Sequence, residues 1–117
     1  MSSANHRKKL IEEYVVAAEE YGRCIQDGNP KGADKCVDVI EGAFVDIKAI
    51  GKEGFDELSS LLELDDESVR LWASSHLLNY PEYNSLSVLE KIKNSTTILA
   101  LTAEVTLDQW RNGKVNY

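Results

Sequence analysis

Apolar residues recur every three or four positions through most of the chain, which is the period of an amphipathic α-helix. Gly, Pro and Asn residues interrupt this pattern and mark the ends of the helices. The sequence therefore predicts an all-α protein of about six helices and no strands. The helices are expected at 5–27, 30–50, 52–63, from the turn at 65–66 to about 79, 81–93 and 96–112.

The segment between the first two predicted helices carries a full set of helix-end signals. Gly28 suits the position after a helix, Asn29 can cap the next one, and Pro30 fits its first turn. Gly32 and Gly42 lie inside the second helix, and each weakens it by about 1 kcal/mol relative to Ala. We expect Gly42 to allow a neighbouring helix to approach closely.

The helices predicted at 30–50, 67–79 and 96–112 superpose when the sequence is shifted by 30 residues. Each carries the same apolar stripe with a small residue at one fixed point, where a paired helix can come close. The aligned sets are Val39, Val69 and Leu99; Ala43, Ala73 and Ala103; Ile47, Leu77 and Leu107; and Ile50, Tyr80 and Trp110. The repeat predicts three antiparallel hairpins stacked as an α-solenoid fragment. A six-helix bundle is the rival arrangement, but a bundle does not require equal spacing.

The turn and second helix of a HEAT repeat resemble the segment Leu61-Leu62-x-x-x-Asp66-x-x-Val69-Arg70-x-x-Ala73. Leu64 stands where such repeats often carry an Asp that pairs with a neighbouring Arg. The chain is also similar to a small bacterial HEAT-like family of unknown function, through Tyr21-Gly22-Arg23, Val88-Leu89-Glu90 and Trp110-Arg111-Asn112-Gly113. This resemblance implies no catalytic residues. Small HEAT-like proteins of this kind can act as immunity proteins against toxins.

The size of the chain fits one domain, residues 1–117, with a core that needs no metal or disulfide to be stable, and we expect no cofactor. Apolar residues make up 43% of it, yet no apolar run is long enough to span a bilayer and no signal peptide is recognisable. We therefore expect a cytoplasmic protein that binds no membrane. Cys24 and Cys36 fall on neighbouring helices, where they form either a disulfide or redox pair, or two small apolar contacts in a reducing compartment.

The net charge of −7 is concentrated between residues 53 and 67, where seven acids stand without a single Lys or Arg. They are Glu53, Asp56, Glu57, Glu63, Asp65, Asp66 and Glu67. A patch of one sign repels nucleic acid and attracts a basic protein. The alternative is a solvated helix face whose acids cap the next helix through Asp65 or Asp66.

The sequence contains no recognisable catalytic constellation. His6 lies near the N-terminus, and His76 lies at the edge of an apolar stripe, where a core residue with one hydrogen-bond partner is the common case. No Cys/His cluster has the spacing of a metal site, and no glycine-rich loop joins a strand to a helix. We therefore expect neither an enzyme nor a metal-binding protein.

A groove is the second candidate binding surface, because a solenoid presents one face of its second helices on the concave side. Its predicted apolar floor comprises Phe44, Val45, Leu71, Leu78, Leu101 and Val105. The same residues could instead pack these helices against one another. Trp72 lies off the central stripe and could reach the surface as an anchor.

The sequence thus favours a non-enzymatic protein-binding module. Its most concrete form is an immunity protein that neutralises a basic, nuclease-type toxin; the alternatives are a scaffold that holds a peptide or helix, and an uncharacterised enzyme. The candidate partner-binding residues are Glu63, Asp65, Asp66, Glu67, Leu71, Trp72, Leu78, Glu104 and Asp108.

Overall fold

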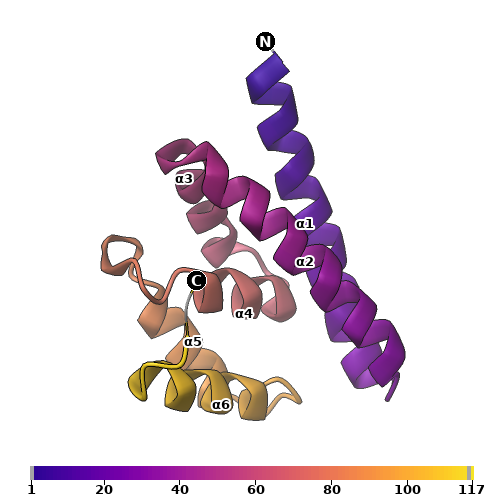
Figure 1. The fold of residues 1–117 in the computed structure, drawn as a ribbon. Helices are drawn as coiled ribbons and strands as arrows, with labels where there is room; N and C mark the ends of the chain where they lie inside the picture. The colour runs from indigo at the N-terminus through magenta and orange to yellow at the C-terminus, as the bar shows by residue number, and fades with distance from the viewer. Residues whose placement is uncertain (1, 116) are drawn as a thin grey trace. The chain divides into compact units, whose positions relative to one another are not determined.

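The structure is a computed structural model that describes residues 2–115 and 117. Within these residues it contains six α-helices and no strand, which confirms the predicted all-α class (Figure 1). The helices are α1 (Ser2–Gln26), α2 (Pro30–Ile50), α3 (Lys52–Ser60), α4 (Glu67–His76), α5 (Ser85–Lys93) and α6 (Ala100–Arg111). Two 3-10 turns accompany them, η1 (Leu61–Glu63) and η2 (Pro81–Tyr83). None of the described helices has the length and apolar character needed to cross a membrane.

Helix α2 has the predicted bounds because side-chain and backbone signals fix both of its ends. The Asn29 side chain accepts a hydrogen bond from the Gly32 amide at 3.1 Å, and Pro30 occupies the first turn. Gly51 ends the helix at φ +92°, in the left-handed region that favours glycine.

The later helices are shorter than the sequence predicts. Asn84 adopts the left-handed conformation at φ +55° and divides the predicted helix 81–93 into η2 and α5. The helix predicted from residue 96 begins only at Ala100, after a turn in which the Ser95 hydroxyl donates to the Ile92 carbonyl. The local hydrogen bond of Ser95 competes with the helix pattern, and the left-handed conformation of Asn84, which Asn tolerates, interrupts it; together these explain the difference.

The helices form two compact units, one up to Ser60 and one from Leu61 onward. In the first unit α1 and α2 lie side by side and α3 packs against both. Its fully buried side chains are Tyr14, Ala18, Ile40, Ile47 and Leu58. The close approach of helices occurs at Gly54, where an added Cβ would lie 2.3 Å from the Ile47 carbonyl oxygen. The prediction for Gly42 is wrong, since nothing lies within 4 Å of its Cβ position.

In the second unit α5 packs against both α4 and α6. Its fully buried apolar side chains are Val69, Ala73, Leu77, Leu89, Ala103 and Leu107. His76 is also fully buried, and its ring lies edge-on to that of Tyr117 at 4.4 Å between centroids. The Tyr80 hydroxyl donates to the Tyr117 carbonyl at 3.0 Å. These contacts fasten Tyr117 to His76 at the end of α4 and to Tyr80, and the ring contact helps to bury His76.

Of the four sets aligned by the thirty-residue spacing, two are buried throughout, whereas Ile50, Tyr80 and Trp110 are only half-buried. Ala43, Ala73 and Ala103 are all buried, and so are Ile47, Leu77 and Leu107. The first set breaks the pattern: Val69 and Leu99 are buried, whereas Val39 is 48% exposed. The prediction that Val39 belongs to the core is therefore wrong.

Candidate functional site

The acidic segment 53–67 divides between the two units, and in the first unit its carboxylates form ion pairs with basic residues of the same unit. Arg7 of α1 reaches α3, where it forms ion pairs with Glu53 at 2.6 Å and with Glu57. The hydrogen bond to Glu57, together with the charges of both carboxylates, raises the pKa of the Arg7 guanidinium above its ordinary value. Lys52 pairs with Asp56 at 2.8 Å. These three acids therefore belong to intramolecular pairs.

In the second unit the acidic residues build the start of α4. The Asp66 carboxylate accepts a hydrogen bond from the Val69 amide at 3.0 Å and caps the helix, which settles the choice between Asp65 and Asp66. Glu67 accepts a hydrogen bond from the Thr97 hydroxyl. Glu63 and Asp65 are exposed, and their carboxylates form no ion pair with any described residue.

Replacing Asp66 with Ala should lower the free energy of unfolding by about 1 kcal/mol, because the Val69 amide loses its capping partner. Urea unfolding followed by circular dichroism measures this loss. Asp65→Ala is the matched control, since it removes one neighbouring acid without touching the cap, and it should change stability by less than about 0.5 kcal/mol. Equal losses in both variants would contradict the structural role of Asp66.

The remaining candidate residues do not form an open groove on α4. Leu71 and Leu78 are buried, and Trp72 is half-buried. The Ser75 hydroxyl between them donates to the Leu71 carbonyl at 2.7 Å. Phe44 of the predicted floor is buried as well, whereas Val45, Leu101 and Val105 are exposed. Glu104 and Asp108 are exposed on α6.

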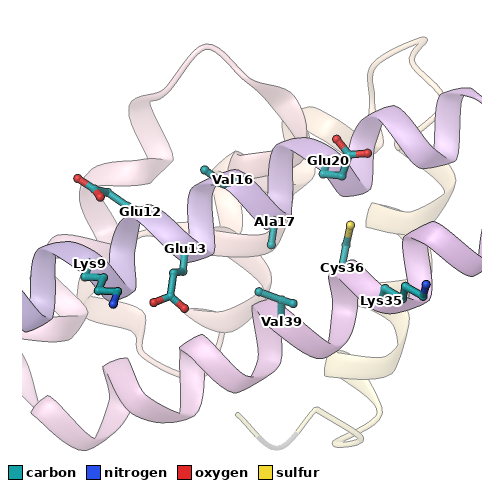
Figure 2. A pocket seen from close by; sticks show the side chains of 9 residues that line it. All are labelled: Lys9, Glu12, Glu13, Val16, Ala17, Glu20, Lys35, Cys36 and Val39. Atoms are coloured by element: carbon teal, nitrogen blue, oxygen red, sulfur yellow. The ribbon is translucent and has the colours of Figure 1, made fainter.

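An open groove of about 560 Å³ lies instead between α1 and α2 (Figure 2). Small or apolar side chains make its floor, and charged side chains make its rim. The residues that line it are Lys9, Glu12, Glu13, Val16, Ala17, Glu20, Lys35, Cys36 and Val39. We call this feature the α1–α2 groove.

The floor of the α1–α2 groove exists because two valines stand beside two small residues. Val16 is 61% exposed and Val39 is 48% exposed, so both present apolar surface to solvent. Ala17 and Cys36 are buried between the helices and are too small to fill the space above them. Exposed apolar surface gathered in a concave site is typical of a binding surface.

Most of the charged side chains on the rim have no partner among the residues that the structure describes. Glu20 pairs with Arg23 at 2.7 Å. The side chains of the other four form no hydrogen bond or ion pair with any residue that the structure describes; they are Lys9, Glu12, Glu13 and Lys35. The acids of segment 53–67, by contrast, mostly have partners within the fold.

The two cysteines are free thiols, and both are buried in the first unit. Burial raises the pKa of the Cys24 thiol, and the neighbouring Cys36 and Glu20 raise it further. A reactive cysteine needs the opposite shift, toward the thiolate. No group of three or more His, Cys, Asp or Glu residues in the described part of the chain is arranged to hold a metal ion.

No family model, curated protein or solved structure matches this chain. Its function is therefore argued from the geometry of its own residues. The sequence reasoning missed the α1–α2 groove because Val16 lies outside the buried stripe of its helix. A signal was present nonetheless: Val16 stands between the pairs Glu12-Glu13 and Glu19-Glu20, where a solvated helix face would carry a polar residue.

Proposed function

We propose that this chain is a non-enzymatic protein-binding module whose α1–α2 groove receives an apolar helical segment of a partner. The observation that carries the proposal is the exposed pair Val16 and Val39, set among four charged side chains that no described residue engages. An apolar centre with a polar rim is the usual composition of a protein interface. From Lys9 to Glu20 the groove follows α1 for roughly 16 Å, the length of about three helical turns.

We further propose that the six helices form three hairpins of a HEAT-like repeat array. The support for this is burial at matching positions. Ala43, Ala73 and Ala103 are all buried, and so are Ile47, Leu77 and Leu107. Repeat arrays of this class have extended concave surfaces that bind other proteins. A bacterial, cytoplasmic setting would fit such a module.

The exposed acids Glu63 and Asp65 support a second candidate function, that of an immunity protein. Their carboxylates are not engaged by any described residue, so they could stand in for phosphate groups at the basic active site of a nuclease toxin. This candidate predicts binding that weakens steeply with salt.

Capture of the partner with paired variants tests both candidates. The tagged chain is used to isolate a partner from the cells that produce it, and binding is then measured by calorimetry with both proteins purified. If the groove binds, Val16→Asp combined with Val39→Asp should weaken binding at least about tenfold, a loss of roughly 1.4 kcal/mol. The control Val45→Asp, at a valine that is 64% exposed on α2 outside the groove, should leave the affinity unchanged.

Charge reversal at the exposed acids distinguishes the immunity function from binding through the groove. Glu63→Lys combined with Asp65→Lys should abolish neutralisation of a basic toxin while leaving binding through the groove intact. An affinity that depends on these two acids and is unaffected by the double valine variant would overturn the proposal for the groove.

A further inference from the structure

The two cysteines of the chain lie in one helical hairpin, with Cys24 on α1 and Cys36 on α2. The short connection at 27–29 makes these two helices antiparallel neighbours (Figure 1). In an α-helix each side chain leans toward the N-terminal end of its own helix. Side chains on the facing sides of antiparallel helices therefore lean in opposite directions, and two that start about one turn apart can lean toward each other.

The neighbours of Cys24 fix the position of its sulfur. A Cβ added at Gly32 would lie 2.8 Å from the Cys24 Sγ, so Cys24 faces Gly32 across the hairpin. The Asn29 side-chain amide donates to the same sulfur at 3.9 Å, and the thiol donates to the Glu20 carboxylate at 3.7 Å. Because Glu20 lies one turn before Cys24, this thiol leans toward the N-terminus of α1, as the helix geometry requires.

Cys36 approaches the same place from the other helix. It lies one turn after Gly32 on the same side of α2, so its side chain leans back toward Gly32. Figure 2 shows its sulfur directed from α2 toward α1. Burial is the main cause of the raised pKa of Cys24, and a hydrogen bond with the Cys36 side chain contributes to it. The two thiols are therefore direct neighbours, and Gly32 places no side chain between them.

The two thiols differ in their access to solvent. Cys36 lines the α1–α2 groove, whereas Cys24 is not among the residues that line it. A small molecule that enters the groove therefore meets Cys36 first. The raised pKa of Cys24 keeps this residue protonated, which makes it a poor first nucleophile. Both observations make Cys36 the thiol that reacts first.

We propose that Cys24 and Cys36 form an oxidation site at which a hydroperoxide converts the two thiols into a disulfide within one chain. The Cys36 sulfur attacks the terminal oxygen of the hydroperoxide, the O–O bond breaks, and the thiol proton goes to the leaving alkoxide. Cys36 is then a sulfenic acid. The Cys24 sulfur attacks the Cys36 sulfur, the S–S bond forms, and the hydroxyl group leaves as water with the Cys24 proton.

The net reaction removes two electrons and two protons from the pair and reduces the hydroperoxide to an alcohol and water. A small thiol reverses it by exchange with the disulfide. Such reversible disulfides are the kind found in reducing compartments. The inference is independent of the proposed function, since it needs only a small molecule to reach Cys36 and no protein partner.

Mapping of the intact chain after treatment with hydrogen peroxide tests the proposal. Trypsin separates the two cysteines, because it cuts after Arg23, Lys31, Lys35 and Lys48. Without reducing agent, peptides 24–31 and 36–48 should appear as one species that weighs two hydrogen atoms less than their sum. Dithiothreitol should release both peptides. The rate of linkage should not depend on protein concentration, because the bond forms within one chain.

Two variants test the order of attack. In Cys24→Ala the sulfenic acid on Cys36 has no second thiol to meet, so dimedone, which adds to sulfenic acids, should label it. In Cys36→Ala the remaining Cys24 should be labelled at least about tenfold more slowly, because it is protonated and lies away from the groove. Circular dichroism should show the wild-type helix content in both variants, since each replaces a small buried side chain with a smaller one.

Three results for the wild type would overturn the proposal: thiols that stay reduced in peroxide, sulfinic acids without linked peptides, or linkage only between chains with a rate that rises with concentration. Equal labelling of the two variants would overturn the assigned order of attack. These measurements use the wild type without any partner, so their failure leaves the proposed function untouched. Loss of a captured partner in the double variant at Val16 and Val39 tests that function separately.

Discussion

Ile47→Ala, Leu77→Ala and Leu107→Ala should each lower the free energy of unfolding by about 2–5 kcal/mol, the range for truncating a large aliphatic side chain in a packed core. All three side chains are fully buried, and they stand thirty residues apart in the sequence. Each truncation removes apolar contacts and leaves a cavity that its neighbours fill only in part. Urea unfolding measures the losses, with helix content monitored by circular dichroism and the second signal by tryptophan fluorescence.

Val45→Ala is the matched control for this series, because Val45 lies on the same helix as Ile47 and is 64% exposed. It should change stability by no more than about 0.5 kcal/mol. Both tryptophans, Trp72 and Trp110, lie in the second unit, so fluorescence reports on that unit. A loss below about 1 kcal/mol at Leu77 or Leu107 would mean that the truncated side chain is not part of a packed core.

The same series shows whether the two units unfold together. Ile47 belongs to the first unit, whereas Leu77 and Leu107 belong to the second. If the chain unfolds in one cooperative step, Ile47→Ala shifts the fluorescence transition as much as it shifts the loss of helix. If the units unfold separately, Ile47→Ala shifts the helix signal and leaves the fluorescence transition in place.

The sequence predicts the helices well where the signals at their ends are local. Helix α2 has its predicted bounds because Asn29, Pro30 and Gly51 act within one turn of its ends. The left-handed Asn84 could not be predicted with the same certainty, since Asn also occurs as a cap and inside helices. Its conformation decides whether residues 81–93 form one helix or two.

The candidate site was harder to predict because partners distant in sequence decide it. The run of acids from Glu53 suggests an unpaired patch, but Arg7 lies 46 residues before Glu53 and neutralises it across the α1–α3 contact. The α1–α2 groove depends on Ala17 and Cys36 leaving a hollow between two exposed valines. The period of apolar residues identifies buried stripes and gives no sign of such a hollow.

Gly54→Ala should destabilise the protein by about 1–3 kcal/mol or more, the range for overpacking a core. The new Cβ would lie 2.3 Å from the Ile47 carbonyl oxygen and 3.2 Å from its Cγ2. The nearest atom belongs to the backbone of α2 and cannot rotate away, so α3 would have to move. The gain in helix propensity, about 1 kcal/mol for Ala over Gly, offsets part of this cost. The free energy of unfolding in urea measures the net effect.

Gly42→Ala is the matched control, because it makes the same chemical change in a helix of the same unit. Nothing lies within 4 Å of the Gly42 Cβ position, so only the propensity term acts and the variant should be more stable by about 0.5–1 kcal/mol. The two substitutions should therefore change stability in opposite directions. A Gly54→Ala protein as stable as Gly42→Ala would show that α3 does not approach α2 at Gly54.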